Sequence, residues 1–86
     1  MAAPLHIASL LVHARPELFE AVKANLHLLA GVELHQQSPL GKLVVVLETV
    51  DEQQILERIE QISNLPGVLN AALVYHEVLS PEEAAE

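Results

Sequence analysis

The chain is short of the residue types on which several classes of function depend. Its 86 residues contain no cysteine, one tyrosine, one phenylalanine, no tryptophan and four lysines or arginines. Without cysteine there are no disulfides, thiolate metal sites or thiol catalysis. With two such aromatic rings and a net charge of −8, the chain offers no base-stacking surface and repels phosphate backbones. We therefore expect no nucleic-acid partner.

Long apolar segments are also missing. The apolar run at residues 43–47 is far shorter than a membrane span. The first residues, Met1 to His6, lack the basic region and continuous apolar stretch of a secretory signal peptide. These features predict a cytoplasmic protein that does not insert into membranes.

A Gly-Val step occurs twice, at Gly31-Val32 and Gly67-Val68, each time between a helix-like stretch and a strand-like stretch. It divides the chain into two strand–helix–strand halves. Apolar or alternating patterns predict strands at residues 5–14, 32–36, 42–48 and 68–78. One helix is expected to begin at Arg15-Pro16-Glu17, and Asp51 with Gln54 predicts the start of a second.

The resulting order, βαββαβ, predicts an α+β protein with the ferredoxin-like sandwich fold. Such a fold has a four-stranded antiparallel sheet, strand order 4-1-3-2, with both helices on one face. We expect residues 1–79 to form a single domain of this kind. Residues 80–86 are mostly acidic or alanine and are expected to be a disordered tail.

Because successive strand residues point to opposite faces, the alternation predicts which side chains the helices leave uncovered. Leu69, Ala71, Leu73 and Tyr75 of the last strand are expected to face the helices. The uncovered face combines an apolar centre, to which Ile7 also contributes, with a polar and partly acidic rim, as interaction surfaces do. Its candidate binding residues are Ser9, Leu11, His13, Glu33, Val44, Val46, Glu48, Ala72, Val74 and His76.

The same pattern of exposed apolar residues can arise in two further ways. Aliphatic residues occur on the wet side of antiparallel sheets for their β-propensity alone. A weak homodimer packed sheet to sheet would also use the same face. We favour a surface for a different partner.

No arrangement in the sequence indicates catalysis or metal binding. The five histidines have no His-x-x-x-His or Glu-x-x-His spacing, so solvated histidines are expected and no metal or cofactor is predicted. No Ser, His and Asp are brought together by the expected fold, and the glycines form no phosphate-binding loop. We expect that the protein is not an enzyme.

Three segments resemble the NapD family, the assembly chaperones of the periplasmic nitrate reductase. They are residues 8–12 of the first strand, residues 41–48 of the hairpin, and residues 66–77, which include Val74-Tyr75-His76. The resemblance covers roughly residues 5 to 79, with Ala72 standing where members can carry a more polar residue.

The resemblance implies a cytoplasmic chaperone without cofactors. It would bind the twin-arginine signal peptide of the nitrate reductase catalytic subunit precursor and delay export until the precursor's cofactors are installed. Such a peptide is basic at its start and then apolar, which complements an apolar face with Glu33 and Glu48 at its rim. The peptide would lie across the open face or add a strand at a sheet edge. A small-molecule-sensing domain or a dimerisation module of the same fold is the alternative, since fold alone does not decide function.

Overall fold

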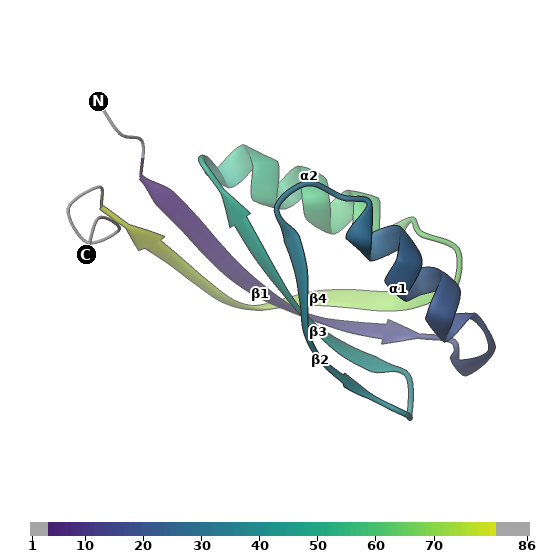
Figure 1. Ribbon diagram of the computed structural model, residues 1–86. Helices are drawn as coiled ribbons and strands as arrows, with labels where there is room; N and C mark the ends of the chain where they lie inside the picture. Colours follow the sequence, from purple (N-terminus) through teal and green to yellow (C-terminus); the bar gives the residue numbers. More distant parts are fainter. Residues whose placement is uncertain (1–3, 81–86) are drawn as a thin grey trace.

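The computed structural model describes residues 4–80, in which two helices lie on one face of a four-stranded sheet. Figure 1 shows both helices on the same side of the sheet, with the opposite side left bare. The elements in chain order are β1 (Leu5–Ala14), the 3-10 turn η1 (Pro16–Leu18), α1 (Phe19–His27), β2 (Val32–Ser38), β3 (Lys42–Thr49), α2 (Glu52–Ser63) and β4 (Val68–Leu79). All neighbouring strands are antiparallel, in the order β2-β3-β1-β4. The predicted fold class and strand order are confirmed.

Both Gly-Val steps lie where a helix gives way to a strand. Gly31 and Gly67 have φ angles of 73° and 94°, which L-residues with a side chain rarely adopt. At Gly67 a Cβ atom would also lie 2.7 Å from Cβ of Leu18. The second helix starts as predicted, because an Asp51 carboxylate oxygen accepts a hydrogen bond of 2.8 Å from the backbone N–H of Gln54.

The hydrophobic core lies between the helices and the inner face of the sheet. The strands contribute alternate residues of β1 and β3, and each helix contributes two fully buried side chains. The buried residues are Ala8, Leu10, Val12, Ala14, Val22, Leu26, Leu43, Val45, Leu47, Ile55 and Ile62. The alternation predicted for β1 and β3 is correct throughout, because these two central strands pair without a register shift from His6↔Thr49 to His13↔Lys42.

The edge strands β2 and β4 each carry extra residues that interrupt this alternation. In β2, His35 has no partner on β3, and in β4, Leu69 and Val74 have none on β1. Such β-bulges shift the following residues to the other face. The prediction for β4 is therefore wrong at two positions: Tyr75 lies opposite Ser9 on the open face, and Leu69 is 61% exposed.

Leu73 and Ala71 do face the helix side, opposite Leu10 and Val12, although Leu73 at the sheet edge stays 45% exposed. Neither of the two α-helices within residues 4–80 is long and apolar enough to cross a membrane. The acidic tail predicted for residues 80–86 lies, apart from Ser80, outside the described residues.

Candidate functional site

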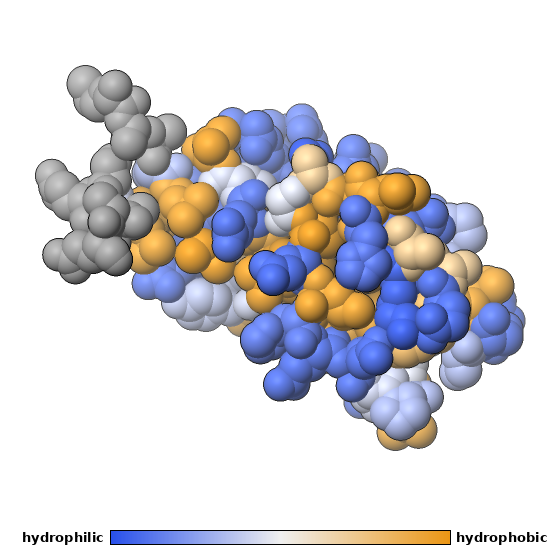
Figure 2. Space-filling view, viewed as in Figure 1, coloured by the Kyte–Doolittle hydropathy of each residue, from blue (hydrophilic) through white to orange (hydrophobic). Residues whose placement is uncertain are grey.

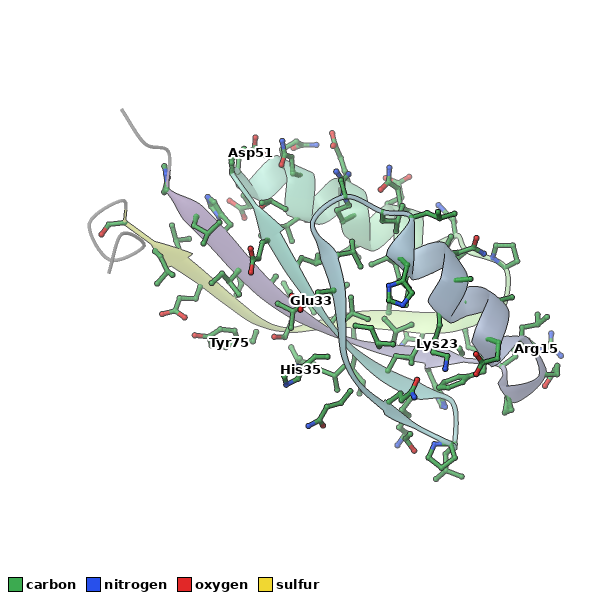
Figure 3. All side chains as sticks on the ribbon, in the orientation of Figure 1. Arg15, Lys23, Glu33, His35, Asp51 and Tyr75 are labelled. Atoms are coloured by element: carbon green, nitrogen blue, oxygen red, sulfur yellow. The ribbon has the colours of Figure 1, made fainter. Side chains whose placement is uncertain are left out.

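The open face of the sheet is the candidate site, and strand pairing defines its residues. Residues directly opposite each other on neighbouring strands share a face, so they form rows across the sheet. Figure 3 shows Glu33, His35 and Tyr75 on the side away from the helices. From one end of the sheet to the other, the rows are Lys42–His13–Asn70, Gln36–Val44–Leu11–Ala72, Glu33–Val46–Ser9–Tyr75 and Glu48–Ile7–Glu77.

The centre of this face is apolar. We call Ile7, Leu11, Val44, Val46 and Ala72 the apolar floor. Leu11 is 39% exposed and the other four are half-buried, although no helix covers them. Figure 2, which looks towards α1 and the β2 edge, shows apolar residues exposed among hydrophilic ones on that side of the molecule. Beside Leu11 and Val44 the floor dips into a shallow hollow of ≈ 210 Å³ next to Gln36 and Lys42. The floor is thus an apolar surface without a partner inside the described chain.

Three carboxylates stand at one end of the apolar floor; we call Glu33, Glu48 and Glu77 the acidic end. Glu48 and Glu77 flank Ile7 in a single row. Glu33 lies on β2, the neighbour of β3, in the adjacent row opposite Val46. Glu33 and Glu48 also line a hollow of ≈ 260 Å³. Neither of their side chains has a hydrogen bond or ion pair within residues 4–80. These carboxylates are therefore available to a cationic ligand.

The third carboxylate of the acidic end is held in place by Tyr75. The Tyr75 hydroxyl donates a hydrogen bond of 2.6 Å to Oε2 of Glu77. This bond raises the pKa of Tyr75 above its ordinary value of 10.0, and desolvation and the negative charge of Glu77 act in the same direction. The folded state therefore binds the phenolic proton more tightly than the unfolded state does. The resulting stability is present below the unfolded pKa of about 10 and is lost as the pH rises through the folded pKa.

We expect Glu77→Gln to lower the pKa of Tyr75 towards its ordinary value, because the negative charge beside the phenol is removed. Phenolate absorbance measured against pH reports this residue alone, since the chain has one tyrosine and no tryptophan. Glu57→Gln, on the helix side, is the matched control and should leave the titration unchanged. An identical titration curve for Glu77→Gln and the unmodified protein would show that the hydrogen bond does not form in solution.

The end of the face away from the carboxylates carries the opposite charge. Lys42 and His13 form its last row; Arg15 follows directly after β1, but its side chain is paired with Glu17 at 3.1 Å. Figure 3 shows Arg15 at one end of the molecule, with Asp51, the residue before α2, marking the region near the opposite end. The chain's two remaining cations lie elsewhere: Lys23 pairs with Glu20 at 2.8 Å, and Arg58 donates to the backbone oxygen of Ala30 at 2.8 Å. The open face therefore has an acidic end, an apolar centre and a cationic end.

The structure brings most of the predicted site residues together. Eight of the predicted residues share the open face: Ser9, Leu11, His13, Glu33, Val44, Val46, Glu48 and Ala72. Val74 is the extra residue of a bulge, between Leu73 and Tyr75, and is 61% exposed. The placement of His76 on the open face is wrong. It lies opposite Ala8, whose side chain is buried in the core, so it faces the helix side.

His76 instead contacts a histidine that is 70 positions earlier in the chain. Nδ1 of His6 and Nε2 of His76 are 3.1 Å apart, and the ring centroids are separated by 5.4 Å. One ring therefore donates its N–H to the other. Within residues 4–80 no group of three or more His, Asp or Glu side chains is placed to hold a metal ion.

Sequence reasoning missed Tyr75, Glu77 and Gln36, which the structure adds to the open face. All three follow a bulge, so strict alternation assigns them to the wrong side. A third hollow, of ≈ 490 Å³, lies between α1 and β2, where Glu20, Lys23 and His27 contribute to its walls. Lys23, the cation that lines this hollow, is already paired with Glu20.

Comparison with known proteins agrees with this architecture. The family model described as "NapD protein" matches residues 5–80. The chain belongs to the NapD family. A relative named Chaperone NapD from Haemophilus influenzae is 34% identical over 73 residues, covering 84% of this chain and 78% of the relative. Chaperone NapD from Escherichia coli K12 is 35% identical over 72 residues, covering 83% of each chain.

A solved structure extends the likeness from sequence to fold. The solution structure of the Escherichia coli Tat proofreading chaperone protein NapD matches with a TM-score of 0.82 and 33% identity. The match covers 90% of this chain and 82% of that one. NapD relatives are thus named as chaperones, and the fold is shared over nearly all of the described residues.

Proposed function

We propose that this chain is a cytoplasmic chaperone for an exported enzyme. It binds the twin-arginine signal peptide of the periplasmic nitrate reductase catalytic subunit precursor. While it is bound, it delays export until the precursor's cofactors have been installed. Membership of the NapD family and the likeness to a Tat proofreading chaperone support the signal peptide as ligand. The chain itself has no catalytic role in this proposal and carries no cofactor.

The observation that carries the proposal is the order of chemical groups on the open face. The apolar floor adjoins the acidic end, and a twin-arginine peptide presents a basic segment next to an apolar one. Burial of the peptide's apolar side chains on the floor supplies hydrophobic free energy. Glu33, Glu48 and Glu77 can each accept hydrogen bonds from a guanidinium group, which pairs with carboxylates through two N–H groups. The face therefore matches both parts of the peptide.

The sheet edges fit the peptide less well than the face. Strand addition needs a continuous row of free backbone groups, and bulges are a common way to disrupt such a row at an edge. The β2 edge is interrupted at His35, and the β4 edge is interrupted at Leu69 and Val74. We therefore place the peptide across the face rather than along an edge.

The length of the floor favours a helical peptide. From Lys42 to Glu48 the strand β3 covers roughly 20 Å at the usual rise per residue. About 13 residues of α-helix span that distance, whereas an extended segment needs only about six. Apolar regions of signal peptides contain about 7–15 residues. A helical apolar region in the upper part of that range thus spans the open face from one end row to the other.

A second copy of the chain is the rival occupant of the floor, as a weak homodimer. The net charge of −8 on each copy opposes this association. Mass measurement in solution, with and without peptide, separates the two occupants. A dimer that dissociates when peptide is added would mean that both use the floor.

Calorimetry with a synthetic twin-arginine signal peptide tests the proposal. We expect saturable binding at one peptide per chain, and weaker binding by about tenfold when both arginines are replaced by lysine. Lysine keeps the charge but cannot make the paired hydrogen bonds of a guanidinium. A peptide with glutamine at both positions controls for charge and should bind more weakly still. If none of the peptides gives a binding signal, the proposed function is wrong.

A further inference from the structure

The open face carries negative charge at one end of its strands and positive charge at the other, and this difference favours one direction for a bound peptide. The acidic end lies at the row Glu48–Ile7–Glu77, and the row Lys42–His13–Asn70 closes the opposite end. A twin-arginine signal peptide is equally polar, because its arginines precede its apolar region. Contact is most favourable when the positively charged end of the peptide lies over the negatively charged end of the face.

We propose that the signal peptide binds in a single direction, with its arginine pair over the acidic end. Its apolar region then crosses Val46, Leu11 and Val44, and its C-terminal part points towards Lys42 and His13. This inference rests on the proposed function, since it assigns the orientation of that same ligand. It also assigns Glu48 and Glu77 as the residues that determine specificity for the arginines.

The geometry of the acidic end suits two neighbouring guanidinium groups. Glu48 and Glu77 are separated by β1, so their backbones are roughly 10 Å apart at normal strand spacing. Each carboxylate can therefore take a different arginine. Tyr75 fixes Glu77 through one carboxylate oxygen, Oε2, and leaves Oε1 free to accept from a ligand. Fixing the acceptor in advance reduces the entropy lost on binding.

The opposite direction is unfavourable at both ends of the face. The arginines would then lie beside Lys42, where like charges repel, and the three carboxylates would have no cation. A helical peptide adds a second electrostatic preference. In the proposed direction its C-terminus, which carries the negative end of the helix dipole, lies near Lys42 and His13.

Paramagnetic broadening of the amide signals of the ¹⁵N-labelled chain tests the direction. One peptide carries a nitroxide next to the arginine pair, and a second carries it at the C-terminus. We expect the first peptide to broaden the amides of Ile7, Glu48 and Glu77, and the second to broaden those of His13 and Lys42. The reversed pattern, or equal broadening at both ends from each peptide, would overturn the single direction while leaving peptide binding established.

Charge removal tests the assigned specificity residues. The double variant Glu48→Gln/Glu77→Gln should weaken binding of the twin-arginine peptide by about tenfold to a hundredfold, as charge-assisted hydrogen bonds are lost. Affinity for the glutamine control peptide should change by less than about threefold, because that peptide has no arginine pair to lose contact. The matched control Glu57→Gln/Glu60→Gln removes the same charge from the exposed surface of α2.

These measurements also separate the inference from the proposed function. Equal losses of affinity in the two double variants would mean that only net charge matters, and would overturn the assignment of Glu48 and Glu77. Absence of binding by the unmodified chain would instead refute the proposed function itself.

Discussion

Replacing Val44 and Val46 together by aspartate should weaken binding of the twin-arginine signal peptide by at least about a hundredfold, or about 2.7 kcal/mol. Both side chains are half-buried on the apolar floor and have no covering layer. Burying one valine side chain is worth about 1.5–3 kcal/mol, and an aspartate beneath an apolar helix must also lose its hydration. The added negative charges would attract a basic peptide, so a loss of affinity reports the apolar contact.

Leu56→Asp is the matched control for this experiment. Leu56 is 54% exposed on α2, on the side of the sheet away from the floor, and undergoes the same apolar-to-aspartate change. Its peptide affinity should stay within about twofold of the unmodified chain. Circular dichroism and thermal unfolding verify that each variant is folded. Unchanged affinity in a folded Val44→Asp/Val46→Asp variant would place the peptide elsewhere on the molecule.

Leu10→Ala should cost about 2–5 kcal/mol of unfolding free energy, which is a large part of the total for a small domain. Leu10 is fully buried in the middle of β1, between Val45 on β3 and Leu73 on β4. The smaller side chain leaves a cavity that the surrounding side chains only partly fill. For a domain of this size we expect the melting temperature to fall by roughly 8–40 °C.

Leu28→Ala makes the same chemical change at a residue that is 81% exposed, and should alter stability by less than about 0.5 kcal/mol. Because Leu10 faces the helices, the folded Leu10→Ala protein should bind peptide as tightly as the unmodified chain. Urea unfolding of both variants measures the difference. Similar unfolding free energies for the two variants would contradict the assignment of Leu10 to the core.

The fold could be predicted from the sequence because its strongest local signals agree with one another. Gly31 and Gly67 mark the ends of the two helical segments, Asp51 marks the start of α2, and β1 and β3 alternate without interruption. Central strands are held on both sides, so their pairing follows the apolar pattern closely. For β1 and β3 the alternation alone was sufficient to assign the open face.

The edge strands could not be predicted equally well, because bulges leave no clear trace in a single sequence. In β4 the neighbouring apolar residues Leu73 and Val74 fit a bulged strand, but they also fit a regular strand buried on both faces. The contact between His6 and His76 depends on the same bulge and joins residues 70 positions apart. Pairing between residues far apart in the sequence therefore decides which face the side chains of an edge strand occupy.

The unpaired Val74 makes the chain tolerant of a change in length at this point. With Val74 removed, Tyr75 would follow Leu73 directly, and Tyr75, His76 and Glu77 would stay opposite Ser9, Ala8 and Ile7. The central strand β1 pairs with β3 without a register shift, so loss of one of its residues would turn all the side chains on one side of the gap to the other face. A deletion scan should therefore yield folded protein after loss of Val74 and unfolded protein after loss of Ser9.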